Sequence, residues 1–241
     1  MILTRVIPTV DEPIDQDAPD FRDRLAELYR PGTSDWVRLN LIGSVSGSAT
    51  GPDGTSETLT NPVDRAILGA IRGQADVVVV GAASIRAEGY FVPRNGALAV
   101  VSRSGNFADH QIKGTTQHGT LIILCPEAAV ETARATIGLP EVAIIPVPDV
   151  DGSLTAPAIV TALRDAGYRS IVVEGGPVLA TLFVTHDAAD ELCLTTSPVL
   201  NGGAMPLFGM QEFATRPLTL TQLLVDSAGA TYARWALRKP A

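Results

Sequence analysis

The stretch Ile171-Val-Val-Glu-Gly-Gly-Pro-Val178 holds the features that decide the fold. Its short apolar run is typical of a strand that is covered on both faces. The two glycines let the backbone turn sharply and approach a ligand closely, and proline is favoured in the first turn of a helix. The stretch therefore predicts a strand, a tight turn and a helix. The free N–H groups at such a helix start can hold a phosphate, although an ordinary tight turn has the same sequence features.

The same alternation continues on both sides of this stretch. We expect further buried strands and intervening helices at Asp76–Val80, Leu98–Val101, Leu121–Leu124, Glu127–Ile137, Val142–Ile145, Ala156–Ala166 and Pro177–Val184. Strands that alternate with helices pair in parallel. Glu191–Thr196, Leu218–Val225 and Thr231–Leu237 follow one another without a long helix, which indicates antiparallel pairing. The predicted fold class is α/β, with a mixed, mainly parallel central sheet flanked by helices and an antiparallel C-terminal edge.

The beginning of the chain differs from this pattern. Residues 2–19 are rich in proline and acidic side chains with little periodicity, so we expect an irregular arm there, followed by a short helix at Phe21–Tyr29. The alternating run Trp36–Ile42 predicts the first core strand. Thr60 or Asn61 can cap a helix that runs to about Gln74. We therefore expect an N-terminal arm and helix over residues 1–35 and one domain over residues 36–241.

The charge of the chain limits its partners. It has 26 acidic and 18 basic residues, a formal net charge of −8, and Lys113 and Lys239 are its only lysines. An acidic surface without basic runs argues against nucleic acid or an anionic membrane as a partner. Arginines and helix N-termini can still bind an anionic cofactor locally.

The cysteines and the N-terminus indicate a cytoplasmic protein. Cys125 and Cys193 each lie in an apolar run without metal-ligand spacing, which suits a reducing compartment. The N-terminal segment has no long apolar region of the kind found in secretory leaders. No apolar stretch approaches the ~20 residues that a membrane-spanning helix needs.

Common motifs of nucleotide and metal chemistry are missing. The sequence has no G-x-G-x-x-G after a strand, no P-loop, no H-E-x-x-H, no C-x-x-C and no nucleophile elbow. His110, His118 and His186 are scattered, and we expect them at the surface. The sequence therefore predicts neither a metal site nor a covalent nucleophile.

Two arginines stand where they could bind phosphate. Arg103 lies between serines at a predicted strand end, and a planar guanidinium beside Ser102 suits a phosphate monoester, although a solvated turn arginine has the same setting. Arg72 lies near the end of its predicted helix. It could meet a second phosphate, or it could only offset the negative end of the helix dipole.

Several segments together resemble the pyrimidine reductases of bacterial riboflavin biosynthesis, relatives of dihydrofolate reductase. The resemblance covers roughly residues 36–240, and its motifs occur in the family's order. Residues 40–47 match the family's strand motif N-x-A-x-S-L-D-G, residues 56–61 its polar strip and residues 71–72 its L-R pair. Residues 80–88 match V-G-x-x-T-V-R-x-[DE], and residues 174–179 match E-G-G-P-x-L. Residues 190–192 match D-E-L, and residues 198–203 match P-x-L-x-G-G.

This resemblance implies NADPH as the cofactor and a phosphorylated pyrimidine as the substrate. The activity that it implies reduces the ribose of 5-amino-6-(5-phosphoribosylamino)uracil to the ribityl form. The cofactor positions that it implies are Ile42, Thr58, Gly81, Ser84, Glu88, Ser102, Arg103, Gly175, Gly176, Pro177, Val178, Leu179 and Ala180. The substrate positions are Asn40, Ser46, Ser56, Arg72 and Glu174. Ser102 and Arg103 match the pair that holds the 2′-phosphate of NADPH.

Two acidic residues are candidates for catalysis. A carboxyl group beside a bound phosphate is expected to have a raised pKa, which suits a general acid. Glu88 is the first candidate and Glu174 the second, and both could instead be plain ligands to hydroxyl or amide groups. Ser46 departs from the family, which has aspartate there, and a hydroxyl cannot carry that charge. The zinc-deaminase motifs of bifunctional members are absent from the sequence.

Two other functions stay open. A pterin reductase of the same fold would need a carboxylate facing the ring from an early strand or helix, and the sequence alone identifies none. A non-catalytic protein that binds the dinucleotide is favoured by Ser46. We also expect a homodimer, because Leu218–Val225 and Thr231–Leu237 would leave an adhesive sheet edge if they were exposed.

Overall fold

The computed structural model of the chain describes all residues except 9–12, 94, 114–118, 203–204 and 238–241. Its helices are α1 (Phe21–Leu28), α2 (Pro62–Arg72), α3 (Ala82–Ala87), the 3₁₀ turn η1 (Glu127–Ala129), α4 (Val130–Ile137), α5 (Ala156–Asp165) and α6 (Pro177–Thr185). Its strands are β1 (Ile2–Ile7), β2 (Ile14–Asp15), β3 (Val37–Ser44), β4 (Val77–Gly81), β5 (Tyr90–Phe91), β6 (Ala97–Val101), β7 (Ile112–Lys113), β8 (Thr120–Cys125), β9 (Val142–Pro146), β10 (Asp149–Val150), β11 (Ser153–Leu154), β12 (Ile171–Gly175), β13 (Glu191–Ser197), β14 (Leu218–Asp226) and β15 (Thr231–Leu237).

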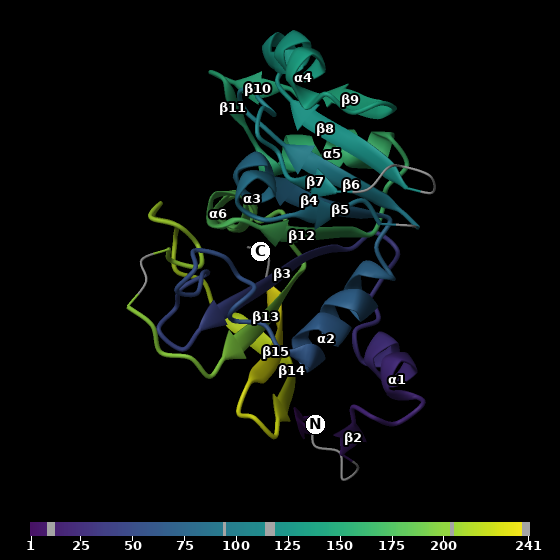
Figure 1. The fold of residues 1–241 in the computed structure, drawn as a ribbon, viewed down its shortest axis with the longest axis vertical. Coiled ribbons are helices and arrows are strands. Elements are labelled where there is room, and N and C mark those ends of the chain that lie inside the picture. Colours follow the sequence, from purple (N-terminus) through teal and green to yellow (C-terminus); the bar gives the residue numbers. More distant parts are fainter. Residues whose placement is uncertain (9–12, 94, 114–118, 203–204, 238–241) are drawn as a thin grey trace.

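One large sheet runs through the molecule (Figure 1), in the order β2-β1-β14-β15-β13-β3-β12-β4-β6-β8-β9. From β13 to β9 every neighbouring pair is parallel. The pairs from β13 through β15, β14 and β1 to β2 are antiparallel. The predicted α/β class, with a mainly parallel sheet and an antiparallel edge, is confirmed.

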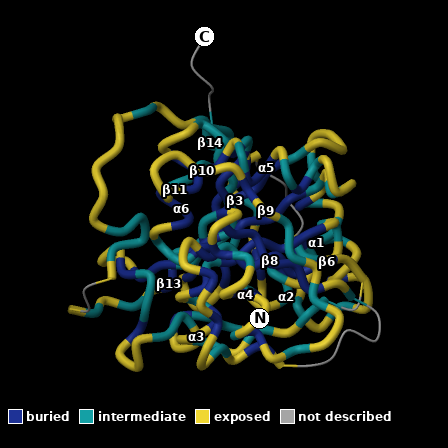
Figure 2. Tube along the Cα trace, turned by 90° about the horizontal axis from the view of Figure 1, so that it is seen from above, coloured by how far each residue is buried: buried dark blue, intermediate teal, exposed yellow. Residues whose placement is uncertain are grey.

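Helices cover both faces of this sheet. On one face α5 and α6 pack on alternate residues of the central strands, with Ile159 and Phe183 fully buried. On the other face α1 and α2 pack over β12 and β14, and α3 and α4 pack over β4, β6 and β8. Figure 2 shows the buried trace concentrated in the interior and exposed segments around it. Two buried faces explain why these strands are apolar throughout rather than alternating.

Helix α2 begins where the sequence predicts. The Asn61 side chain accepts a hydrogen bond from the Asp64 N–H, and Pro62 occupies the first turn. The Asn61 amide also donates to Asp226 and to Tyr232, which belong to the C-terminal hairpin. The cap therefore ties α2 to the antiparallel part of the sheet.

The irregular arm predicted for residues 2–19 is wrong for Ile2–Ile7 and Ile14–Asp15, which form β1 and β2. Strand β1 pairs with β14, and Leu3 is fully buried there. The signal was hidden because this strand is stabilised by backbone pairing with a segment more than 200 residues away in the chain. Only Leu3 of its six residues is buried, so β1 lacks the apolar pattern by which the core strands were recognised.

This finding removes the reason for expecting a homodimer. The apolar strands β14 and β15 are not an exposed edge, because β1 covers β14 and β13 covers β15. Backbone groups that would attract a second chain are already paired.

Three smaller expectations also have outcomes. Cys125 and Cys193 are buried free thiols, as predicted. His186 is exposed as expected, but His110 is half-buried, and its Nε2 lies 2.8 Å from the Ile137 carbonyl oxygen. His118 lies outside the described residues. No described helix is both long and apolar enough to span a bilayer.

Candidate active site

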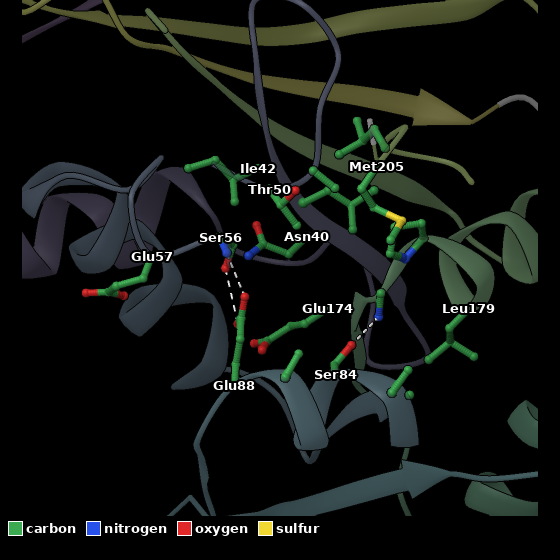
Figure 3. Close-up of a pocket in the computed structure, with 18 of the residues that line it drawn as sticks. Asn40, Ile42, Thr50, Ser56, Glu57, Ser84, Glu88, Glu174, Leu179 and Met205 are labelled. Carbon is green, nitrogen blue, oxygen red and sulfur yellow. Dashed lines mark hydrogen bonds between the residues drawn. The ribbon is translucent and has the colours of Figure 1, made fainter. Parts of the chain in front are cut away.

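A cavity of about 1010 Å³ lies beyond the carboxyl ends of β3, β4 and β12 (Figure 3). One wall is the cavity-facing side of α2, and another is the beginning of α6. The loop before α2 and the segment after β13, which includes Met205, complete it. Ligands of open α/β sheets bind at this end of the strands.

The glycine corner after β12 forms the floor beside α6. Gly175 has φ +92°, which favours glycine, and the peptide bond between Gly175 and Gly176 is cis. The Gly176 N–H donates to the Ser84 hydroxyl at 2.7 Å, which fixes the corner to α3. A Cβ atom on Gly81 would lie 3.8 Å from the backbone of both glycines. Neither glycine adds a side chain to this corner, and Ser84 contacts it from α3.

The start of α6 is suited to an anion. Its first turn has no acidic side chain, and its N-cap, Gly176, provides no side chain that could satisfy the first N–H groups. Val178 is 78% exposed, whereas Leu179 lines the cavity and is 6% exposed. A helix start of this kind presents unpaired N–H groups and the positive end of the dipole to a ligand.

Glu174 and Arg72 form a bidentate pair across the cavity floor. The guanidinium donates from Nε and from its second terminal nitrogen to the two carboxylate oxygens at 2.7 and 2.6 Å. The Glu174 side chain is 6% exposed and that of Arg72 is 35% exposed. Burial lowers the pKa of Arg72, but the hydrogen bonds and charge of Glu174 outweigh it, so the net direction is upward. This ion pair therefore links α2 to β12 and fixes the positions of both charged side chains.

Glu88 is held by the loop that precedes α2. Its carboxylate accepts from the Ser56 N–H at 2.6 Å and from the Ser56 hydroxyl at 3.2 Å. Figure 3 shows Glu88 and Glu174 entering the cavity from α3 and β12, opposite Ile42 and Met205. Three chain segments that are far apart in sequence therefore bring two carboxylates into one cavity.

The cavity contains four ionisable groups that sequence reasoning missed, which are Glu57, Asp64, Arg65 and Tyr90. Asp64 on α2 lines it, and burial raises the pKa of this carboxyl group although Thr60 and Thr195 donate hydrogen bonds to it. Asp64 precedes Arg72 by two helical turns, so helical spacing from Arg72 could have found it. Tyr90 also lines the cavity. Burial and the charges of Glu174 and Glu88 raise the pKa of its phenol, and no sequence signal marked it.

Most of the predicted site residues line this cavity. Those that do are Asn40, Ile42, Ser56, Arg72, Gly81, Ser84, Glu88, Glu174, Gly176, Pro177, Val178 and Leu179. Those that do not are Ser46, Thr58, Ser102, Arg103, Gly175 and Ala180. Ala180 is fully buried in the core against the sheet, because it faces inward from α6.

Two of the outlying residues belong to loops at the rim. Ser46 is exposed, and its hydroxyl donates to the Asn201 carbonyl at 2.8 Å. Thr58 is exposed and donates to Asp53 at 3.0 Å. The departure from the family pattern at Ser46 therefore falls outside the cavity wall. Gly203, the last residue of the matched P-x-L-x-G-G segment, lies outside the described residues.

Ser102 and Arg103 follow β6, two strands away from β12. The Ser102 hydroxyl accepts from the Gly105 N–H at 3.1 Å and is buried, whereas Arg103 is exposed. They lie at the same carboxyl edge of the sheet as the glycine corner, because β6, β4 and β12 are parallel neighbours. A long ligand laid along this edge could reach from one to the other.

Among the residues that the structure describes, no group of three or more histidine, cysteine or acidic side chains is placed to hold a metal ion.

A family model for the RibD C-terminal domain matches residues 35–232. The chain belongs to this family. The resemblance drawn from the motifs is therefore confirmed at the level of the family. No curated protein is significantly similar in sequence.

Solved structures share the fold of this RibD-type domain. A pyrimidine reductase-like protein from Corynebacterium diphtheriae is 22% identical with a TM-score of 0.69, and the match covers 90% of this chain and 99% of that one. A bifunctional deaminase/reductase from Thermotoga maritima is 17% identical with a TM-score of 0.67, with coverage of 84% and 56%. The riboflavin biosynthesis reductase Rib7 of Saccharomyces cerevisiae is 14% identical with a TM-score of 0.60, with coverage of 92% and 100%.

These matches cover nearly the whole of the Corynebacterium and Saccharomyces chains and about half of the Thermotoga chain. At these identities they show the fold.

Proposed function

We propose that the chain is an NADPH-dependent reductase that reduces the ribose of 5-amino-6-(5-phosphoribosylamino)uracil to the ribityl form. One observation carries the proposal: Glu88 and Glu174, each fixed by its own partner, share a cavity with the bare glycine corner and the start of α6. The RibD C-terminal family is one of reductases that use NAD(P)H.

The cavity fits a nicotinamide dinucleotide. Its volume of about 1010 Å³ is at the upper end of the roughly 300–1,000 Å³ that accommodates one small ligand, so a cofactor and part of a substrate can share it. A pyrophosphate would meet backbone N–H groups at Val178 and Leu179, where the glycine corner brings no side chain into the way. Ser102 and Arg103 would hold the 2′-phosphate at the other end of the same sheet edge.

When bound, the reduced coenzyme supplies a hydride to the anomeric carbon of the opened sugar. The chain's own residues orient the substrate and handle one proton. Glu174 is already engaged by the Arg72 guanidinium, so it suits acceptance of hydrogen bonds from the substrate. Glu88 accepts only from an amide and a hydroxyl of Ser56, which leaves it the better candidate to pass a proton at the ring oxygen.

Stopped-flow absorbance at the NADPH band tests the proposal. We expect oxidation of NADPH with the phosphorylated ribosylaminopyrimidine alone, and a fall in kcat of about 100-fold or more for Glu88→Gln. Glu131→Gln, at an exposed glutamate on α4 outside the cavity wall, is the matched control. If the chain binds NADPH but does not oxidise it with any candidate substrate, a non-catalytic role is favoured instead.

A second candidate function has one observation in its favour. A pterin reductase needs a carboxylate that faces the ring from an early strand or helix, and Asp64 on α2 is a cavity carboxylate of that kind. Turnover with dihydrofolate that is abolished in Asp64→Asn would select this function. Turnover with the ribosylaminopyrimidine phosphate that survives the same substitution would select the first.

A further inference from the structure

The cavity has more acidic than basic groups, although the proposed substrate is a phosphate monoester. Among its described lining residues are four carboxylates, Glu57, Asp64, Glu88 and Glu174, and two guanidinium groups, Arg65 and Arg72. Each guanidinium is already paired with a carboxylate, Arg72 with Glu174 and Arg65 with Glu57. The phosphate of the substrate therefore needs a further cation.

Lys113 is a candidate for this cation, because it is not itself a lining residue but lies against Gly89, which is one. Lys113 is one of two lysines in the chain, and it lies on β7, which runs beside β5 (Figure 1). In this pairing Lys113 is opposite Phe91. Both residues of β5, together with the preceding Gly89, line the cavity. The side chain of Lys113 is exposed and makes no salt bridge within the described part of the chain.

The ammonium group of Lys113 lies directly against Gly89. A Cβ atom built on Gly89 would be 3.1 Å from Nζ and 3.0 Å from Cε, which is closer than most Cβ contacts. The glycine thus leaves the space through which the lysine reaches the rim. Any larger residue at this position would displace the ammonium group from the rim.

The backbone that carries Lys113 is firmly held. The Gln111 N–H donates to the Ile85 carbonyl at 2.7 Å, and its side-chain amide donates to the Arg86 carbonyl at 2.6 Å. Ile112 packs into the core formed by β4, β6 and β8. Gln111, which lies two positions before the lysine, is therefore anchored to α3, the helix that leads into Glu88 and Gly89.

We propose that Lys113, seated over Gly89, binds the phosphate monoester of the substrate at the cavity mouth. The inference rests on the proposed function and extends it to the group that distinguishes phosphorylated from unphosphorylated substrates. The sugar then spans from the mouth to Glu88, and the pyrimidine lies deeper, beside Glu174 and Arg72. One charge-assisted hydrogen bond of this kind changes affinity by roughly 10-fold or more.

Calorimetry with ribose 5-phosphate and with ribose tests this without turnover. We expect the wild-type chain and Lys113→Arg to bind ribose 5-phosphate, and Lys113→Ala to bind it roughly 10-fold more weakly or worse. Gly89→Ala should weaken it in the same direction, because its Cβ atom displaces the ammonium group. Arg134→Ala, at an exposed cation on α4, is the charge-matched control and should bind like the wild type.

Kinetics with the full substrate separate this proposal from the proposed function. Lys113→Ala should raise KM for the phosphorylated substrate with little change in kcat, and should leave KM for the dephosphorylated analogue and the Kd of NADPH unchanged. A loss of NADPH affinity in Lys113→Ala would assign the lysine to a cofactor phosphate and overturn the proposal. Wild-type ribose 5-phosphate binding that Lys113→Ala does not weaken, or no such binding in the wild type, would overturn it as well. A chain that shows these binding differences but never oxidises NADPH would refute only the reductase function.

Discussion

At the scale of single residues, the site depends on charges whose partners are fixed. Glu88 and Glu174 are anchored by Ser56 and Arg72, so neither carboxylate has to be ordered when a ligand arrives. Groups that are held in place before binding lose little conformational entropy on binding. Arg103, by contrast, is exposed at a strand end, where a guanidinium can meet a cofactor phosphate without first breaking a buried ion pair.

Arg103 should determine the choice between the two nicotinamide coenzymes. Arg103→Ala removes the guanidinium that would face the 2′-phosphate, which only NADPH carries. We expect the Kd of NADPH to rise roughly 10- to 100-fold and that of NADH to change by less than about 2-fold. Titration of both coenzymes by fluorescence measures this, and an equal loss for both would show that Arg103 does not contact the 2′-phosphate.

Asp64 should make stability depend on pH. Burial raises the pKa of Asp64 above its usual 3.8, against the lowering by Thr60, Thr195 and Arg65. A carboxyl group with a raised pKa stabilises the fold while it is protonated, and this stability is lost as pH rises through the raised value.

Asp64→Asn should therefore have a higher free energy of unfolding than the wild type at neutral pH. The difference should shrink as pH falls towards the unfolded value of 3.8, where the wild-type carboxyl becomes protonated in both states. Urea denaturation across this range measures it. A stabilisation that stays constant with pH would mean that titration of Asp64 is not the cause.

At the scale of elements, a buried ion network docks α1 on the sheet. Glu191 on β13 accepts from Arg38 Nε at 2.5 Å and from Arg234 Nε at 2.8 Å. Arg38 also donates to the Tyr29 carbonyl, and Arg234 donates to the carbonyls of Leu28 and Arg30. The two arginines thus satisfy the carbonyl groups that the end of α1 leaves unpaired.

Glu191→Ala should be strongly destabilising, because it leaves two guanidinium groups buried without their carboxylate. The exposed fractions are 2% for Arg38 and 15% for Arg234. We expect a loss of about 3–5 kcal/mol in the free energy of unfolding, measured with urea. Glu131→Ala breaks an exposed pair with Arg134 on α4 and should cost less than about 1 kcal/mol. Similar losses for both variants would contradict this account.

At the scale of the whole molecule, the N-terminal strand closes the sheet. Strand β1 pairs with β14 over Leu3 to Ile7 and buries Leu3 and Leu224 completely. Without β1 the apolar strand β14 would present unpaired backbone groups to solvent, which promotes association between chains. Residues 1–34 precede the matched family region, and their strands β1 and β2 belong to the same sheet as the strands that carry the cavity.

Removal of residues 1–7 should cause self-association. We expect the shortened chain to show a mass that rises with concentration in light scattering, whereas the intact chain does not associate through this edge. Thr4→Ala changes an exposed side chain but keeps the backbone pairing, so it should behave like the intact chain. A shortened chain that stays at the mass of one copy would show that β1 does not protect the edge.

The sequence by itself determined the elements whose signals are local. The apolar runs, the Asn61–Pro62 helix start and the glycine corner before Pro177 were all read correctly, because each depends on residues that are neighbours in the chain. The ordered motifs also pointed to the family, and most of the site residues that they predicted line the cavity.

The tertiary structure decided everything that depends on contacts between distant segments. It paired β1 with β14, placed Ser46 outside the cavity wall, brought Asp64 into the cavity and laid Lys113 against Gly89. Backbone pairing and burial act between groups that meet only in the folded chain, so neither leaves a pattern at fixed spacing. For the same reason, the sequence shows which residues are charged, but only the folded structure shows which charged residues are paired with one another.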